Sequence, residues 1–123
     1  MDQILIFMNT IFHLGNCTTC QRILSELNLP QNIRLQNIKD EPVSEDQLDK
    51  MQSLAGSYEA LFSKRAMKYR SMGLNEQILS EEDFKKYILE EYTFLKRPVV
   101  VWNDEIFIGS AKKTVESLKV IFP

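Results

Sequence analysis

The sequence predicts an α/β protein: a mixed four-stranded sheet with helices, and an all-helical insertion between the second and third strands. Three observations support this prediction. Apolar spacing changes from a strand period to a helix period and back between residues 10 and 38, which indicates a strand, a helix and a second strand. Two short apolar runs near the C-terminus are spaced as a hairpin and precede another helix. The stretch from about residue 40 to 96 is helical in pattern and too long for a loop.

The first three predicted elements form a β-α-β unit. Residues 10–14 are strand-like, and Gly15-Asn16 interrupts them. Apolar residues recur at helical spacing from Thr18, and we expect this helix to end at Leu29-Pro30, because proline pushes the preceding residue out of helical geometry. Residues 33–38 then alternate apolar and polar side chains, which is typical of a half-buried strand.

Signals for helix starts and helix ends divide the insertion into several helices. Ser44 and Gln47 form a capping box, and Gly56 ends the helix that begins there. Residues 58–72 indicate either two short helical pieces or one bent helix. Another helix starts within residues 80–83, where a serine precedes three acidic residues.

The C-terminal part predicts two strands and a helix. Residues 99–102 are a continuous apolar run, which suits a strand buried on both faces. Residues 103–105 make a turn into a second run at 106–108, so the two runs form a hairpin. Gly109-Ser110 ends the second strand, and apolar residues at helical spacing from Val115 predict the final helix.

We expect one domain over residues 9–123 and an N-terminal extension over residues 1–8. Met8 is an alternative start, because the first strand begins just after it; otherwise residues 1–7 are a genuine, loosely ordered extension. The first residues are too short for a signal peptide and carry an acid where positive charge belongs. No apolar run approaches the roughly 20 residues of a membrane span.

The composition excludes several classes of protein. With 44% hydrophobic residues, 26% charged residues and a net charge of −2, it is that of a soluble globular protein. The slight acidity argues against direct nucleic-acid binding, which needs a basic face. Two cysteines in 123 residues do not make a secreted disulfide framework. We therefore expect a cytoplasmic monomer that binds neither membranes nor nucleic acid.

Both cysteines lie in Cys17-Thr-Thr-Cys20, where the first strand turns into the first helix. Helix N-termini offer unpaired N–H groups and positive dipole charge, which stabilise a thiolate. Cys17 is therefore the candidate nucleophile, and the more shielded Cys20, one turn later, suits the resolving role. The alternatives are two inert buried cysteines, or a zinc site, for which His13 is the only further ligand besides carboxylates.

A β-α-β unit with this motif at its first turn, followed by X-Pro, a hairpin and a helix, is the thioredoxin-like plan. Proline at the position of Pro98 is usually cis in such proteins and packs against the cysteines. Arg97 then borders the sulfur site, where it steadies a thiolate or binds an oxyanion; the alternative is a surface arginine. His13 either pairs as an imidazolium with the thiolate or bonds only to backbone or solvent.

The only concentrated basic run covers residues 63–70. Most such runs are solvated helix faces. The functional alternatives are that Arg65 points at an anion site or that the run meets an acidic partner.

The chain resembles the ArsC/Spx family of thioredoxin-like proteins from about residue 9 onward. That family includes glutaredoxin-dependent arsenate reductases and the Spx regulators that bind RNA polymerase. The resemblance rests on an ordered set of motifs: Cys17-Thr-Thr-Cys20, Asn37-Ile-Lys-Asp-Glu-Pro-Val-Ser44, Phe62-Ser-Lys-Arg65, Lys96-Arg-Pro-Val-Val-Val101 and Ile108-Gly109.

The resemblance implies roles for individual residues. In the arsenate reductases, a nucleophile matches Cys17, an upstream histidine matches His13, and one of three arsenate-binding arginines matches Arg97. A third arginine would fall near residues 109–110, where this chain has none. Cys20 is typical of Spx, whose insert arginine matches Arg65.

We therefore expect an arsenate reductase-like thiol–disulfide oxidoreductase. Cys17 attacks an oxyanion or a disulfide, Arg97 and Arg65 offset negative charge, and Cys20 or glutathione resolves the intermediate. No cofactor or metal is bound; glutathione, glutaredoxin or thioredoxin supplies electrons. The alternative is an Spx-like, redox-switched regulator that binds RNA polymerase through its α subunit without catalysis.

Overall fold

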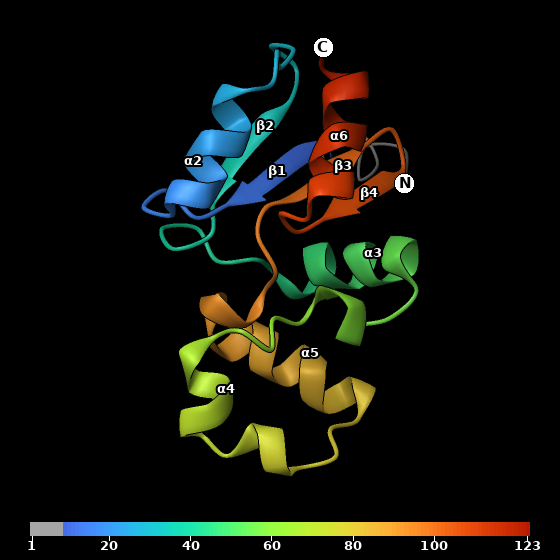
Figure 1. Ribbon diagram of the computed structural model, residues 1–123. Coiled ribbons are helices and arrows are strands. Elements are labelled where there is room, and N and C mark those ends of the chain that lie inside the picture. Colours follow the sequence, from blue (N-terminus) through green and yellow to red (C-terminus); the bar gives the residue numbers. More distant parts are fainter. Residues whose placement is uncertain (1–8) are drawn as a thin grey trace. The chain divides into compact units, whose positions relative to one another are not determined.

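The computed structural model describes residues 9–123, which divide into two compact units (Figure 1). One unit combines the described chain up to Glu41 with Arg97–Pro123, and the other is Pro42–Lys96. The expectations for residues 1–8 lie outside the described residues. Within residues 9–123, no helix has the length and apolar character needed to cross a membrane.

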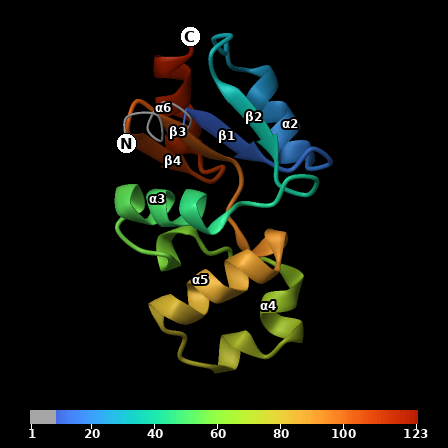
Figure 2. The same cartoon turned by 180° about the vertical axis from the view of Figure 1, so that it is seen from behind.

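The first unit is built on a four-stranded mixed sheet in the order β2-β1-β3-β4, which can be followed in Figure 2. β1 (Thr10–His13) pairs parallel with β2 (Arg34–Asn37) and antiparallel with β3 (Val99–Trp102). β3 pairs antiparallel with β4 (Glu105–Ile108) across the predicted hairpin. The α/β class and the mixed four-stranded sheet predicted from the sequence are therefore confirmed.

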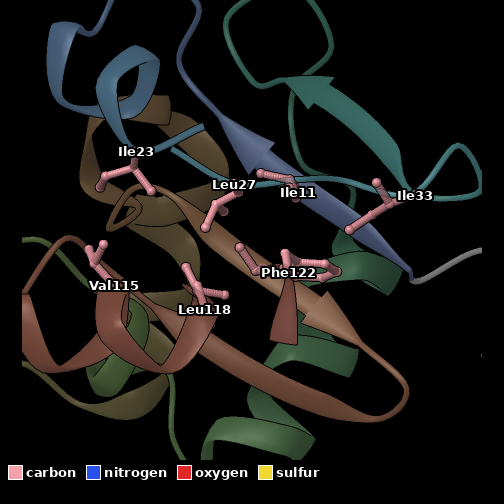
Figure 3. Close-up of a cluster of buried hydrophobic side chains, with 8 residues drawn as sticks. Ile11, Ile23, Leu27, Ile33, Val115, Leu118 and Phe122 are labelled. Carbon is pink, nitrogen blue, oxygen red and sulfur yellow. The ribbon is translucent and has the colours of Figure 1, made fainter. Parts of the chain in front are cut away.

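Helices α2 (Thr18–Ser25) and α6 (Lys112–Ile121) bury their apolar side chains against one face of this sheet. Ile11 and Val100, which are register partners on β1 and β3, supply the sheet side of the core. Figure 3 shows side chains from both helices converging on it. The remaining members of the cluster are Ile23, Leu27, Ile33, Val115, Leu118 and Phe122. Full burial of one such side chain contributes about 1.5–3 kcal/mol, so this core fixes α2 on the sheet.

Helix α2 is shorter than predicted, because it ends at Ser25 and not at Leu29-Pro30. The backbone N–H of Asn28 donates to the carbonyl of Phe122 at 3.2 Å. A bond to the C-terminal segment thus replaces one that a further helical turn would supply.

Strand β2 departs from the predicted alternation of buried and exposed residues. Leu35 is 52% exposed, whereas Gln36 is only 1% exposed. Arg34 Nη1 donates to Oε1 of Gln36 at 3.1 Å, and Nε2 of Gln36 donates to the carbonyl of Glu41 at 3.0 Å. Burial of this amide is tolerated because its hydrogen bonds are made within the protein.

The named elements of the second unit are all helices, and one isolated antiparallel bridge joins Phe62 to Leu95. Its elements are α3 (Glu45–Ala55), η1 (Glu59–Leu61), α4 (Met67–Ser71), η2 (Leu74–Glu76), α5 (Glu81–Glu90) and η3 (Tyr92–Phe94). The capping box of Ser44 and Gln47 is present, and Gly56 ends α3 with a φ of 96°. Residues 58–72 form two short pieces, the first of the two predicted alternatives. The 3₁₀ turns η2 and η3 were not predicted, because three residues are too few for a periodic signal.

Aromatic packing and one ion-pair cluster hold the helical unit together. The ring of buried Phe62 lies 4.9 Å from that of Phe94 and 5.0 Å from that of Phe84, measured between centroids. Nζ of Lys85 lies 2.8 Å from a carboxylate oxygen of Glu45 and 3.0 Å from one of Asp49. These contacts join α5 to α3 and to Phe62, which precedes α4 and also packs on η3.

Candidate functional site

Cys17 is the N-cap residue of α2 and has extended backbone angles, φ −90° and ψ 116°. Its N–H donates to the carbonyl of Leu14 at 3.0 Å, and its carbonyl accepts from the N–H of Gln21 at 3.0 Å. Cys17 is half-buried, Cys20 is buried, and both are free thiols. The two sulfurs therefore occupy the first turn of a helix, with only Cys17 partly open to solvent.

The environment of Cys17 favours its thiolate. Burial acts to raise the pKa of Cys17, but the other influences outweigh it. Hydrogen bonding by the backbone and the thiol of Cys20 and by the backbone of Thr19 acts to lower this pKa, and the charge of Arg97 adds to that effect. The pKa of Cys17 consequently lies below its ordinary value. A thiolate at a helix N-terminus with a neighbouring cation is the reactive form of cysteine.

The environment of Cys20 favours its protonated thiol. Burial raises the pKa of Cys20 to about 11, and the charge of the neighbouring Cys17 sulfur acts in the same direction. A hydrogen bond with the backbone of Leu14 and the charge of Arg97 oppose this rise without cancelling it. Cys20 thus keeps its proton while Cys17 ionises, so the first thiol can attack while the second donates to it.

His13 is the last residue of β1, and its carbonyl accepts from the N–H of Ile38 at 2.9 Å. Burial lowers the pKa of His13, so its ring is mainly neutral at pH 7. The positive charge that acts on Cys17 comes from Arg97. The structure therefore does not support the predicted imidazolium–thiolate pair, and a catalytic role for His13 stays a prediction.

Arg97 and Pro98 lie next to the sulfur site within the same unit. The peptide bond between them is cis, the isomer expected from the sequence, and Pro98 is buried while Arg97 is half-buried. The carbonyl of Pro98 accepts from the N–H of Gly109 at 2.8 Å, so the end of the hairpin borders this segment. The charge of Arg97 acts on both sulfurs, which makes Arg97 the cation of the site.

Arg65 belongs to the helical unit, just before α4, and is exposed. Nζ of Lys64 lies 3.1 Å from a carboxylate oxygen of Glu59, and Nζ of Lys68 lies 2.5 Å from one of Glu91. Part of the basic run is thus a paired helix surface, as most such runs are. A role for Arg65 at the thiols stays a prediction.

Sequence reasoning missed a hydrogen-bonded group directly before Cys17. Oδ1 of Asn37 accepts from the backbone N–H of Gly15 at 3.1 Å, and Nε2 of Gln21 donates to the carbonyl of Gly15 at 2.6 Å. The available signal was positional: β1 and β2 were both predicted, and parallel strands bring Asn37 beside His13.

Within residues 9–123, no three His, Cys, Asp or Glu side chains cluster so that they could hold a metal ion.

Comparisons with known proteins agree with this architecture. The model of the ArsC family matches residues 12–118. The global transcriptional regulator Spx of Streptococcus mutans is 27% identical over 104 residues, covering 83% of this chain and 76% of that protein. An arsenate reductase from Vibrio cholerae has a similar structure, with a TM-score of 0.74, 18% identity and coverage of 89% of this chain and 95% of that one.

A second solved structure shares the fold. It is an arsenate reductase (ArsC) related protein from Brucella melitensis, with a TM-score of 0.67 and 18% identity. The match covers 88% of this chain and 91% of that one. At such identities the two structural likenesses establish the thioredoxin-like fold and not an activity.

Proposed function

Because the chain belongs to the ArsC family, we propose that it is a thiol–disulfide redox protein in which Cys17 attacks and Cys20 resolves. The observation that supports this most strongly is the unequal pair of thiols in one helical turn. The pKa of Cys17 is lowered at the helix N-terminus, while burial raises the pKa of Cys20, which donates a hydrogen bond to Cys17. One sulfur is therefore ready to attack, and the second is held beside the first.

With a disulfide substrate, the Cys17 thiolate attacks one substrate sulfur and expels the other as a thiolate. The resulting mixed disulfide is then attacked by Cys20 after it loses its proton. The Cys17–Cys20 disulfide forms, and the second substrate sulfur leaves as a thiolate. The substrate has gained two electrons and the protein has lost two. Glutathione, glutaredoxin or thioredoxin returns the protein to the dithiol.

Arsenate is the oxyanion substrate that we propose to test first, because members of the family are named arsenate reductases. The Cys17 thiolate attacks arsenic and forms a sulfur–arsenic bond. One arsenate hydroxyl group is protonated and leaves as water. Cys20 or glutathione then attacks the Cys17 sulfur, and the electron pair of the broken bond stays on arsenic. Arsenic(V) leaves as arsenite, containing arsenic(III). Arg97, whose charge acts on both sulfurs, offsets the negative charge at the sulfur.

The second candidate is a redox-switched regulator without turnover. It is favoured by the likeness to the transcriptional regulator Spx over 83% of the chain. In this alternative, the same Cys17–Cys20 disulfide changes the affinity of the protein for the α subunit of RNA polymerase. The absence of an arginine near residues 109–110, where the arsenate reductases have one, favours it over arsenate chemistry.

An assay with several electron donors separates the two candidates. Purified protein is tested for arsenite production with glutathione, glutaredoxin and thioredoxin, beside Cys17→Ser and Cys20→Ser. Turnover that is abolished by Cys17→Ser supports the reductase. No turnover with any donor rejects it. Redox-dependent binding of the RNA polymerase α subunit, abolished by either serine variant, would then support the regulator; binding that ignores the redox state would reject that alternative as well.

A further inference from the structure

The turn immediately before Cys17 is held by side chains from two different elements. Asn37, at the end of β2, accepts the backbone N–H of Gly15 through Oδ1 at 3.1 Å. Gln21, in the first turn of α2, donates from Nε2 to the carbonyl of Gly15 at 2.6 Å. One residue of the turn is thus tied to the sheet on one side and to the helix on the other.

The Asn37 side chain is itself held in place. Its Nδ2 donates to Oδ2 of Asp40 at 3.2 Å, and its Oδ1 also accepts from the N–H of Lys39 at 3.3 Å. The backbone carbonyl of Asn37 accepts from the N–H of Glu41 at 2.8 Å. These bonds orient the amide so that its oxygen faces Gly15.

Position 15 has no space for a side chain unless Asn37 shifts. A Cβ there would lie 2.5 Å from Nδ2 of Asn37, while φ of Gly15 lies outside the left-handed region and suits any residue. The close approach of the turn to Asn37 thus depends on the missing side chain. Cys17, two residues later, is tied to the same turn, because its backbone N–H donates to the carbonyl of Leu14 at 3.0 Å across Gly15 and Asn16.

We propose that Asn37 and Gln21 are positioning residues that hold the Gly15–Asn16 turn so that the Cys17 sulfur stays against the first backbone N–H groups of α2. The value of this positioning for a reaction rests on the proposed function, but the positioning itself is measurable without a substrate. The titratable and charged groups that act on Cys17 are Cys20 and Arg97. Neither proposed variant replaces them.

The test compares Asn37→Ala and Gln21→Ala with Asn9→Ala as a matched control. Asn9 also accepts a backbone N–H through Oδ1, that of Asn103 at 2.9 Å, but at the opposite end of the sheet. The readouts are the ultraviolet absorbance of the Cys17 thiolate against pH and the rate of iodoacetamide alkylation, located by mass spectrometry. Gln21 is exposed, so its variant keeps the proposal testable if Asn37→Ala unfolds.

We expect both variants to raise the pKa of Cys17, Asn37→Ala by more. A rise by one pH unit lowers the thiolate fraction at pH 6 about tenfold. The more basic thiolate is intrinsically about threefold more reactive, which offsets part of this loss, so the observed alkylation rate falls about threefold. Asn9→Ala should lose stability without changing the titration. A purely structural role for Asn37 and Gln21 would give folded variants that titrate like the wild type, and this result would overturn the proposal.

A second comparison uses Gly15→Ala alone and together with Asn37→Ala. The single variant should raise the pKa of Cys17, because its methyl group meets Asn37. In the double variant the methyl group has space, and the added effect of Gly15→Ala should disappear; equal effects in both backgrounds would contradict the proposal. If the wild type neither reduces arsenate nor exchanges disulfides, the proposed function fails, whereas these titrations still decide the positioning roles.

Discussion

Replacing Cys20 by alanine and by serine should change the ionisation of Cys17 in different ways. Burial acts against the Cys17 thiolate, and hydrogen bonds together with Arg97 outweigh that effect. One of those hydrogen bonds comes from the Cys20 thiol. Alanine removes this donor, whereas serine keeps a donor of nearly the same size. The backbone N–H groups of the helix remain in both variants.

The magnitude follows from the contribution of one hydrogen bond to an anion. Such a bond contributes about 1.5–3 kcal/mol. The lower end of this range applies, because Cys17 is half-buried and solvent screens its charge. One pH unit in a pKa corresponds to about 1.4 kcal/mol. We therefore predict that the pKa of Cys17 is about one pH unit higher in Cys20→Ala than in the wild type, and nearly unchanged in Cys20→Ser.

The assay is a pH titration of thiolate absorbance on the three reduced proteins. In the wild type, the Cys17 and Cys20 steps are separated because burial raises the pKa of Cys20 to about 11. Both variants retain only the Cys17 step. Far-ultraviolet circular dichroism at each pH checks that the variants stay folded. Equal Cys17 titrations in Cys20→Ala and the wild type would refute the reasoning, because the Cys20 thiol would then contribute nothing to the thiolate.

Three further predictions concern charge, histidine and packing. Arg97→Gln should raise the pKa of Cys17, and the rise should shrink in high salt, because salt screens the charge of Arg97 in the wild type. Arg97→Lys keeps the charge and should leave this pKa nearly unchanged; thiolate titrations at two ionic strengths check both expectations. His13→Gln should leave that pKa unchanged because the ring is mainly neutral, and NMR should show His13 titrating below 6.5; a rise of one pH unit in Cys17 would restore the imidazolium pair. Leu118→Ala should cost about 2–5 kcal/mol in urea unfolding, against about 0.5 kcal/mol or less for Val120→Ala, which is 80% exposed on the same helix; similar losses would contradict the assigned core.

The reduced protein also has a predicted pH dependence of stability. The pKa of Cys20 is raised on folding, so its protonated form is favoured in the native state. This contribution is complete below the ordinary thiol pKa and is lost as the pH rises from there to about 11. The free energy of unfolding of the reduced wild type, measured with urea, should therefore fall over this pH range by more than that of Cys20→Ser. Parallel curves for the two proteins would contradict the assignment.

Local sequence signals were sufficient where local interactions decide the structure. The capping box of Ser44 and Gln47 and the apolar run of β3 needed no information from elsewhere in the chain. The predicted end of α2 was wrong: the helix stops at Ser25, and the N–H of Asn28 bonds to the C-terminal segment, which a local pattern does not reveal. Burial of Gln36 was missed for the same reason: its partners are set by how β2 lies and not by its own polarity.

The candidate site divides in the same way. Cys17 and Cys20 were identifiable because a cysteine pair at a helix start has a local meaning. The bond between Asn37 and Gly15 joins residues 22 apart in sequence and depends on the parallel register of β1 and β2, which no local pattern reveals. The charge state of His13 likewise depends on burial and not on its place in the sequence.

The most direct test of the central claim is the order in which the two thiols react with glutathione disulfide. Each reduced protein is mixed with increasing amounts of glutathione disulfide, quenched with acid and analysed by mass spectrometry. The wild type should form the Cys17–Cys20 disulfide and release both glutathiones. Cys20→Ser should stop at a glutathione adduct on Cys17, and Cys17→Ser should form almost none at neutral pH. An adduct that forms first on Cys20, or a wild type that never forms the internal disulfide, would contradict the assignment of Cys17 as nucleophile and Cys20 as resolving thiol.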